Sequence, residues 1–348
     1  MSYRALKFAL TAAASTALVL GPSGIARAGG DLFICNWTDY TAPDVIKKFE
    51  KETGVKVTLD TYDSNETLLA KLKSGSAGYD IVVVSSDFVP IFAKEGLIQK
   101  IDGTKLPGYD KIEARWQNPT WDPGRAYSVP YDWGVTAYSV NTKFVKEPAD
   151  SLKLLFDPPP EAKGKVGMFG SPSEVIGLAE VYLGLPPCQT DPANMKKVSD
   201  LLEAQAPAVK VYNSDGIIDR QGSGETWIHQ AWNGDAARTR AVNPDVKFVF
   251  PKEGVVGWMD NIAIPTGAKD PDNARLFVEF MMKPENSAMS SNFTHYASAI
   301  SGAAADYDPA MKDAPELQVP PDLKMAFTPA CPEAATKLMD RVWTKLKK

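Results

Sequence analysis

Apolar and polar positions alternate between strand and helix periods along the first third of the chain. Strands are predicted over residues 32–35, 55–59 and 79–84, and helices over residues 43–53, 63–74 and 88–95. Asp63 is the expected N-cap of the second helix, and Glu66 completes a capping box with it. The run over 79–84 is apolar without a break, as in parallel strands that are buried on both faces. This alternation predicts an α/β fold built on a doubly wound sheet.

A second unit with the same type of alternation follows residue 135. Strands are predicted over residues 166–169 and 246–250, helices over 174–183 and 224–233, and a return crossing over 258–265. The amphipathic segment 272–282 is expected to pack as a helix on the first sheet. Because the chain is longer than one ordinary hydrophobic core supports, two domains are expected.

The first 28 residues have the pattern of a secretory signal peptide rather than of a folded element. Arg4 and Lys7 precede an apolar stretch over residues 8–20, and Ala26-Arg27-Ala28 forms a small-x-small cleavage site. Cleavage is expected between Ala28 and Gly29. No cysteine follows the cut, and no later apolar run in the sequence is long enough to span a bilayer. The mature protein is therefore predicted to be exported to the periplasm.

The charge balance bears on the kind of partner. The sequence has 38 Lys and Arg against 43 Asp and Glu, and the predicted leader contains Arg4, Lys7 and Arg27 but no acid. The mature chain thus has 35 basic and 43 acidic residues, a net charge of −8. This argues against nucleic acid and anionic membrane as partners and is compatible with a cationic ligand, although solubility alone would give the same balance.

Three cysteines and two histidines limit covalent and metal chemistry. Cys188 and Cys331 lie in Pro-rich, loop-like contexts, and in an oxidising compartment they are expected to form a disulfide. Cys35 lies in the first apolar run and is expected to be a buried free thiol. With only His229 and His295 available, neither a Cys/His metal site nor another cofactor is predicted.

Common enzyme motifs do not occur in the sequence. There is no G-x-S-x-G elbow, no Walker loop, no H-E-x-x-H and no G-x-G-x-x-G. No carboxylate pair stands out as that of a glycosidase, so a periplasmic hydrolase is the least favoured class. The sequence therefore indicates a protein that binds rather than an enzyme.

Residues 36–40, Asn-Trp-Thr-Asp-Tyr, put two aromatic side chains and a carboxylate directly after the first predicted strand. Open α/β sheets bind ligands at such strand-to-helix loops. Aromatic faces beside a carboxylate suit an organic cation, because the ring quadrupole attracts it and the carboxylate pairs with it. The alternative is that Trp37 and Tyr40 belong to the core and that Asp39 is solvated.

Several motifs together give a specific resemblance. Segments 36–40, 49–54, 63–66, 78–83, 232–235, 251–254, 258–260 and 342–345 follow the order and spacing of the periplasmic polyamine-binding proteins, the spermidine/putrescine receptors of ABC importers. The resemblance covers essentially the whole mature chain. It implies a type II periplasmic-binding-protein fold with two hinged α/β lobes, a monomeric state, and delivery of a putrescine-like diamine to an inner-membrane ABC permease. Spermidine and agmatine remain open as ligands.

The resemblance also implies where the lobes begin and end. The first lobe is expected over residues 29–132 with 264–305, and the second over residues 133–263 with 306–348. The two hinge crossings are expected at 131–136 and 261–265, where the chain would pass between the lobes.

Eleven ligand-binding residues are implied by the resemblance. They are Trp37, Thr38, Asp39, Tyr40, Ser85, Glu174, Trp232, Asp235, Trp258, Asp260 and Tyr296. Spacing supports two pairs, because Trp232 and Asp235 would share one face of the helix predicted there, and Trp258 and Asp260 would share one side of a strand. Glu174 has an alternative role, since Ser171 and Glu174 together read as a capping box. Thr38 and Ser85 are small loop hydroxyls, which often only cap helices.

A rival ligand class is an ω-amino acid such as γ-aminobutyrate, or an opine-like compound. Its carboxylate would need a cationic partner, most naturally a bidentate arginine. Arg238 follows Asp235 by three residues, and Arg220 and Arg240 are nearby in the sequence. Such arginines more often lie on a solvated helix face.

Overall fold

The computed structural model describes residues 29–75 and 78–347, so the predicted signal peptide lies outside the described residues. The strands are β1 (Asp31–Trp37), β2 (Lys56–Tyr62), β3 (Ile81–Ser85), β4 (Ser128–Asn141), β5 (Val166–Met168), β6 (Val209–Tyr212), β7 (Ile228–Trp232), β8 (Val246–Val249), β9 (Val255–Ala263), β10 (Ala297–Ser298) and β11 (Met325–Phe327). The α-helices are α1 (Pro43–Thr53), α2 (Asn65–Lys73), α3 (Val89–Lys94), α4 (Ala114–Gln117), α5 (Lys153–Phe156), α6 (Pro172–Tyr182), α7 (Pro192–Gln205), α8 (Ile217–Gly222), α9 (Asn233–Val242), α10 (Pro271–Met281), α11 (Pro284–Thr294), α12 (Pro309–Lys312) and α13 (Glu333–Leu346).

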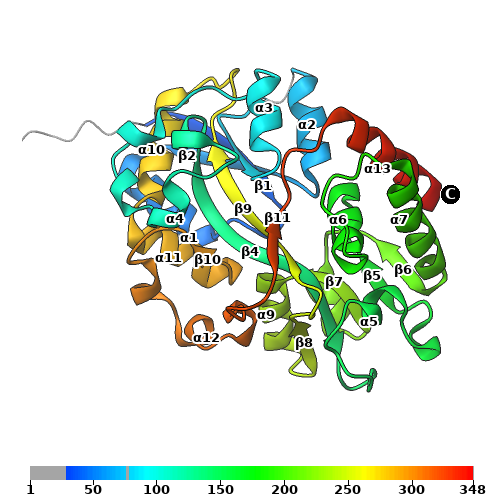
Figure 1. Ribbon diagram of the computed structural model, residues 1–348. Coiled ribbons are helices and arrows are strands. Elements are labelled where there is room, and N and C mark those ends of the chain that lie inside the picture. The colour runs from blue at the N-terminus through cyan, green and yellow to red at the C-terminus, as the bar shows by residue number, and fades with distance from the viewer. Residues whose placement is uncertain (1–28, 76–77, 348) are drawn as a thin grey trace, which may run out of the picture.

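The first lobe is the doubly wound unit that the periodicity predicts. Strands β2, β1 and β3 pair in parallel in that order, and β9 adds antiparallel to β3 (Figure 1). Phe49 of α1 packs edge-on against Phe277 and Phe280 of α10 in one core cluster. Leu68 of α2 and Phe92 of α3 belong to a second cluster. Helices thus cover both faces of the sheet, as buried parallel strands require.

The second lobe has its own core around β5, β6 and β7. Strand β5 pairs in parallel with both β6 and β7, while β4 adds antiparallel to β7 and β8. Apolar side chains from α6 and α7 form this core, and Met339 and Val342 of the C-terminal α13 join it. The predicted disulfide between Cys188 and Cys331 is confirmed, and it fastens the segment before α13 to this lobe. Cys35 is a buried free thiol, also as predicted.

Two long strands connect the lobes and align their sheets. Strands β4 and β9 are antiparallel, with Val129 opposite Ile262 on the first-lobe side and Val135 opposite Gly257 on the second-lobe side. The register shifts between Pro130 and Trp133, as at a β-bulge. Strand β11 pairs in parallel with β9, so the C-terminal segment lies along the same junction (Figure 1). Within the part of the chain that the structure describes, all eleven strands therefore form one connected sheet system.

The predicted helix over residues 224–233 is wrong. Residues Ile228–Trp232 form β7, a central strand paired with both β4 and β5, and α9 begins only at Asn233. The residues of β7 are buried up to Ala231, and the period of a fully buried run does not distinguish a strand from a helix. Sheet pairing, which the local pattern does not contain, decides between the two.

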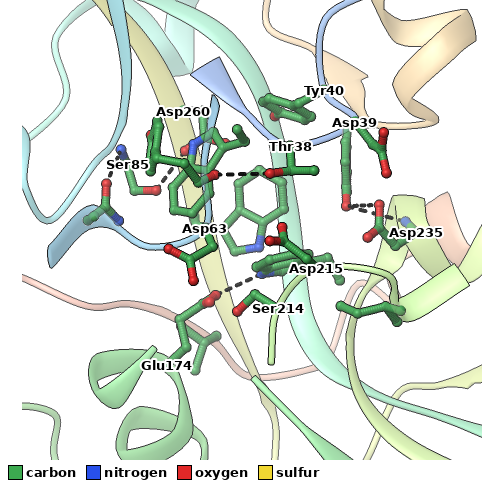
Figure 2. Close-up of a pocket in the computed structure, with 18 of the residues that line it drawn as sticks. Thr38, Asp39, Tyr40, Asp63, Ser85, Glu174, Ser214, Asp215, Asp235 and Asp260 are labelled. Carbon is green, nitrogen blue, oxygen red and sulfur yellow. Dashed lines mark hydrogen bonds between the residues drawn. The ribbon is translucent and has the colours of Figure 1, made fainter. Parts of the chain in front are cut away.

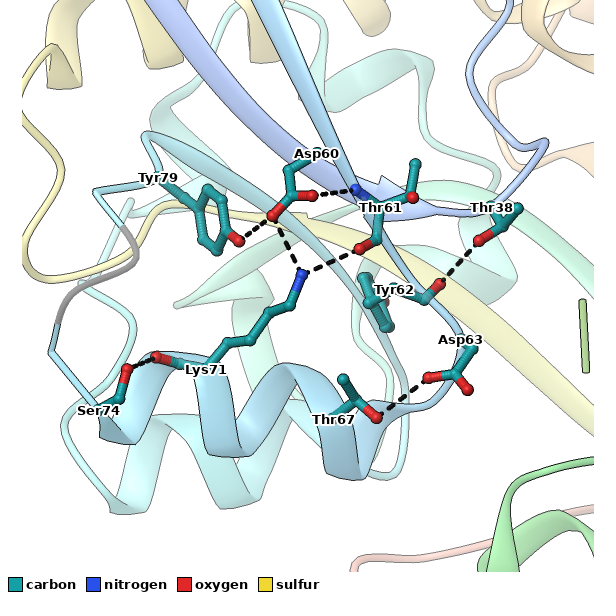
Figure 3. Close-up of polar contacts among 9 residues, drawn as sticks. All are labelled: Thr38, Asp60, Thr61, Tyr62, Asp63, Thr67, Lys71, Ser74 and Tyr79. Atoms are coloured by element: carbon teal, nitrogen blue, oxygen red, sulfur yellow. Dashed lines mark hydrogen bonds and ion pairs between the residues drawn. The ribbon is translucent and has the colours of Figure 1, made fainter.

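The predicted cap of α2 is also wrong by one residue. Ser64 is the N-cap, and its hydroxyl accepts a hydrogen bond from the Thr67 amide at 3.2 Å. Asp63 instead accepts from the Thr67 hydroxyl at 3.0 Å (Figure 3). Glu66 does not close a capping box, because its Oε1 accepts from the hydroxyl of Ser173 in the second lobe at 3.0 Å.

Among the described residues, no helix is long and apolar enough to cross a membrane.

Candidate functional site

A cavity of about 240 Å³ lies between the two lobes, and it brings together all eleven predicted site residues. Figure 2 labels Thr38, Asp39, Tyr40, Ser85, Glu174, Asp235 and Asp260 among them. The predicted residues on it are Trp37, Thr38, Asp39, Tyr40, Ser85, Glu174, Trp232, Asp235, Trp258, Asp260 and Tyr296. They come from the ends of β1, β3 and β7, from β9, from the first turns of α6 and α9, and from the segment after α11. The site thus depends on both lobes.

The loop after β1 supplies two aromatic walls. Tyr40 is buried, and its ring packs edge-on against Tyr131 and Tyr296 with centroids 5.3 and 5.4 Å away. Trp37 lies edge-on to Trp232 of the other lobe at 6.3 Å. Over the described residues, neither the Tyr40 hydroxyl nor Trp37 Nε1 has a hydrogen-bond partner, although both are buried. Both polar groups nevertheless act on the Asp260 carboxylate and lower its pKa.

Thr38 and Asp39 of the same loop are exposed. The Thr38 hydroxyl donates a long hydrogen bond of 3.5 Å to the Tyr62 carbonyl, which holds the loop on β2 (Figure 3). Asp39 has a left-handed backbone with φ of 55°, and its carbonyl accepts from Arg238 of α9 at 3.1 Å. The backbone of this loop therefore has clear structural partners, and Asp39 is the least enclosed of the predicted carboxylates.

Lys71, a basic residue of the first lobe, forms its ion pair outside the cavity. Lys71 Nζ lies 3.0 Å from both the Asp60 carboxylate and the Thr61 carbonyl (Figure 3). Tyr79 donates to the same carboxylate, and this hydrogen bond is the main cause that lowers the pKa of Asp60. Lys71 is thus occupied by Asp60 and does not line the cavity.

Asp260 and Ser85 face each other across the junction of β9 and β3. They are register partners, and Ser85 Oγ donates to Asp260 Oδ1 at 2.7 Å. Burial raises the pKa of Asp260 to about 6. The hydrogen bond from Ser85, together with the polar groups of Tyr40 and Trp37, lowers this pKa and offsets part of the effect of burial. The spacing of Trp258 and Asp260 predicts that both side chains lie on one side of a strand, and both do line the cavity.

Asp235 and Tyr296 form a second polar pair. Tyr296 donates to Asp235 Oδ1 at 3.0 Å, and the Asp235 amide donates back to the Tyr296 oxygen at 3.3 Å. Burial raises the pKa of Asp235, and the charge of Arg238 partly offsets this. The helical-face argument for Trp232 and Asp235 is wrong, since Trp232 ends β7 and Asp235 lies in the first turn of α9. The strand-to-helix turn brings both to the cavity all the same.

Glu174 faces the cavity from the first turn of α6. Its Oε1 accepts from Trp232 Nε1 at 2.7 Å and from the Thr136 hydroxyl at 3.3 Å. Ser171 is the N-cap of α6, as the capping pattern predicts, but the Glu174 carboxylate does not complete the box. Burial raises the pKa of Glu174 to about 8, with carboxylates nearby adding to the shift. Its Oε2 is buried and has no partner in the described structure.

Sequence reasoning missed several acids that also line the cavity. These are Asp63, Asp87, Asp215 and Asp219. Asp87 follows Ser85 by two residues at the carboxyl end of β3, so the rule for strand-to-helix loops could have found it. Asp215 and Asp219 lie around the start of α8, where the local pattern gives no comparable signal.

The cavity is strongly acidic. Eight of the residues that line it are carboxylates, and Arg238 is the only basic one in the part of the chain that the structure describes. The Arg238 guanidinium is already engaged, 3.8 Å from the Asp235 carboxylate and 5.3 Å from the Phe293 ring centroid. Buried carboxylates without counter-charges are unfavourable unless they are protonated or meet a cation. The chemistry of the cavity therefore suits an organic cation with an apolar body.

Two α/β lobes joined by crossing strands, with a polar cavity between them, define the class of two-lobed periplasmic binding proteins. The family model of bacterial extracellular solute-binding proteins matches residues 44–319, and the chain belongs to this family.

Three relatives show which members of this family the chain resembles. The chain is 34% identical to the putrescine-binding periplasmic protein SpuD of Pseudomonas aeruginosa, over 97% of this chain and 96% of that protein. It is 38% identical to the spermidine/putrescine-binding periplasmic protein of Escherichia coli, over 78% of each. A solved structure, the putative spermidine/putrescine ABC transporter from Listeria monocytogenes, superposes with a TM-score of 0.85 at 31% identity, covering 91% of this chain and 98% of that one. These relatives confirm the predicted periplasmic location.

Proposed function

We propose that the protein captures a small linear polyamine between its lobes and delivers it to an ABC permease, without chemical change of the ligand. The observation that carries the proposal is the charge of the cavity, with eight carboxylates and one engaged arginine inside aromatic walls. The names of the relatives support the same ligand class. A monomeric state is part of this proposal.

The walls and the acids have separate tasks in binding. Faces of Trp37, Trp232 and Trp258 contact the methylene groups and lie against the ammonium heads. Asp235 pairs with one head, and Asp260 and Glu174 pair with the other. Asp39 acts through water, and the hydroxyls of Thr38 and Ser85 complete the hydrogen bonds.

The size of the ligand explains why two lobes are needed. Micromolar affinity corresponds to about −8 kcal/mol. A diamine of roughly six heavy atoms can gain at most about −1.5 kcal/mol per atom. Almost every ligand atom must therefore touch protein, which an enclosed cavity allows and an open groove does not.

Closure would take place about the crossing strands. We keep the lobe boundaries of 29–132 with 264–305 and 133–263 with 306–348, and the hinges at 131–136 and 261–265, as part of the proposal. The bulge of β4 at Pro130 and Trp133 adjoins the first hinge and supports it. X-ray scattering should give a smaller radius of gyration with a bound polyamine than without, and identical curves would contradict closure.

An ω-amino acid is the second candidate, and the cavity argues against it. Its carboxylate would have to bind beside Arg238, whose partners are already Asp235 and the Asp39 carbonyl. A thermal-shift panel of putrescine, spermidine, agmatine and γ-aminobutyrate separates the two. Stabilisation by the amines is expected, whereas a response to γ-aminobutyrate alone would replace the proposal.

Substitution of Asp260 tests the site itself. Asp260→Asn keeps the shape but removes a buried charge, and polyamine binding measured by calorimetry should weaken by about 3–5 kcal/mol. Asp245→Asn, which removes an exposed charge outside the cavity, serves as the matched control and should leave affinity unchanged. Near-wild-type binding by Asp260→Asn would mean that the site is wrongly assigned.

A further inference from the structure

Hydrogen bonds join the two lobes across the cleft at both of its ends. At one end, Arg238 of α9 donates to the Asp39 carbonyl at 3.1 Å. At the other, the Ser173 hydroxyl of α6 donates to Glu66 Oε1 of α2 at 3.0 Å. Figure 2 places Asp39 and Glu174, the residue after Ser173, on opposite sides of the pocket. The lobes are therefore held together on both sides of the cavity.

The contact of Glu66 differs from the other one in its relation to the cavity. Asp39 and Arg238 both line the cavity, whereas Glu66 is not among the described residues that line it. Ser173 does line the cavity, so the bond between Glu66 and Ser173 lies at the edge of the cavity wall. Glu66 thus joins the lobes from a position where it does not touch a ligand inside the cavity.

The Glu66 carboxylate caps a helix of the opposite lobe. Ser173 is the second residue of α6, an eleven-residue helix. Burial raises the pKa of Glu66, while hydrogen bonding from both the hydroxyl and the backbone amide of Ser173 lowers it. The N-cap Ser171 accepts only from the Glu174 amide, at 3.5 Å, which leaves the Ser173 amide to Glu66. Free amides and the helix dipole favour a negative group at this end of a helix.

The residues on either side of this contact position the ligand site. Asn65, which precedes Glu66, accepts from the Ser85 amide at 3.3 Å. Glu174, which follows Ser173, lines the cavity. Helices α2 and α6 face each other between the lobes (Figure 1), so the contact sets the part of the site with Ser85 against the part with Glu174.

We infer that Glu66 is an interlobe latch, whose bond to the first turn of α6 forms when the lobes close and sets how long they stay closed on the ligand. The inference rests on the proposed function for its ligand, and it goes beyond that function by naming a residue that acts on closure alone. A ligand enters and leaves when the lobes separate, and their separation breaks the bond between Glu66 and Ser173.

The latch has a kinetic consequence that a ligand-contacting residue does not have. Its bond stabilises the closed form by the same amount whichever ligand is inside, so its loss should speed the release of every ligand by the same factor. Capture begins from the open form, in which the bond is absent, so the association rate constant should not depend on it. The latch also needs an acceptor oxygen rather than a charge, because its partner is a hydroxyl.

The test measures association and release by stopped flow, with putrescine and spermidine as probes. Fluorescence of Trp37, Trp232 and Trp258, which line the cavity, supplies the signal. Glu66→Ala should speed the release of both amines about tenfold and change their association rate constants less than about twofold. Glu66→Gln keeps an acceptor oxygen and should release both within about threefold of the wild-type rate. Glu161→Ala is the control, since it removes an exposed glutamate outside the cavity and should change neither rate.

Ser173→Ala tests the latch from the other lobe and keeps the inference testable if Glu66→Ala folds poorly. It removes the donor hydroxyl and should also speed the release of both amines. Because the two side chains form one bond, Glu66→Ala should speed release less in the Ser173→Ala background than in the wild type. The same factor in both backgrounds would refute the latch.

The outcomes separate the latch from the proposed function. Should neither amine bind the wild type, the proposed function fails and the latch falls with it. Should both amines bind but leave Glu66→Ala at the wild-type rate, the latch is refuted while polyamine capture stands. Unequal acceleration of the two amines, or as fast a release from Glu66→Gln as from Glu66→Ala, also refutes it, because either result means that Glu66 acts on the charge of the ligand.

Discussion

Gly234 sets how closely Tyr296 approaches α9, and Gly234→Ala should therefore weaken ligand binding. A Cβ at this position would lie 2.5 Å from Tyr296 Cε1 and 2.6 Å from Cδ1. Normal carbon contacts are 3.5–4.0 Å, so the ring must move by about 1 Å. Tyr40 and Trp258 enclose the ring, with centroids 5.4 and 5.0 Å away, and leave it little room.

Replacing Gly234 with alanine has two effects of opposite sign on the free energy of unfolding. Gly234 lies in the first turn of α9, where alanine favours the helix by up to about 1 kcal/mol. Moving Tyr296 breaks its hydrogen bond to Asp235, worth about 1.5–3 kcal/mol for a charged acceptor. The difference between these two effects is about 0.5–2 kcal/mol, and forcing the ring to move in a packed site adds about 1–3 kcal/mol, so the unliganded protein should lose about 1.5–5 kcal/mol of unfolding free energy. Polyamine affinity should fall at least tenfold, because Asp235 is no longer held in place.

Calorimetric titration and thermal unfolding of the same variants test this reasoning. Gly177→Ala in α6 is the matched control, because its Cβ would meet only Thr328 Oγ1 at 4.0 Å, and it should keep wild-type affinity. In a Tyr296→Ala background, Gly234→Ala should cost little further affinity, since the clash is gone. Wild-type affinity in Gly234→Ala, or an equal loss in both backgrounds, would refute the role of Tyr296.

Two further predictions concern pH and the disulfide. The folded-state pKa values of Asp260, about 6, and Glu174, about 8, lie above their ordinary values, so the folded protein holds more protons than the unfolded chain. Their stabilising contribution is complete below pH of about 4 and is lost as pH rises towards 8, so the unliganded melting temperature should fall over that range. Because polyamine binding needs the ionised carboxylates, the affinity should increase over the same pH range and binding should release protons. Calorimetric titration in two buffers of different ionisation enthalpy measures this release. Equal heats of binding in both buffers would contradict it. The double variant Cys188→Ser/Cys331→Ser removes the disulfide that joins two residues 143 positions apart. Because the unfolded chain then gains loop entropy, the free energy of unfolding should fall by up to about 5 kcal/mol. An unchanged melting temperature would show that the disulfide does not stabilise the fold.

Local pattern was enough for much of the first lobe. The buried run before Asn36, the helical spacing of Val45 and Phe49, and the unbroken apolar run of β3 each predict an element that the structure contains. The loop after β1 and the period-2 pair on β9 also reach the cavity as expected. These predictions succeed because each depends on a few neighbouring residues and on a single period.

Other features needed contacts that no local pattern contains. Ser64 rather than Asp63 caps α2, because two adjacent side chains can both serve and the tertiary position of the turn decides between them. Residues 228–232 become a strand because β4 and β5 lie on either side of them. Asp87 enters the site because the end of β3 faces α6 across the cleft.

Local sequence was sufficient to predict the alternation of elements, the acidic balance, the pairing of two of the three cysteines and the order of motifs that the polyamine-binding resemblance uses. Which distant groups meet depends on how the sheet and the two lobes assemble. Tyr296 reaches Asp235 from 61 residues away, Trp232 reaches Glu174 from 58, and Ser85 reaches Asp260 from 175. The physical reason is that secondary structure follows from local periodicity and hydrogen bonding, whereas the strength of a charge or hydrogen bond in the cavity depends on burial and on partners that sheet order brings together.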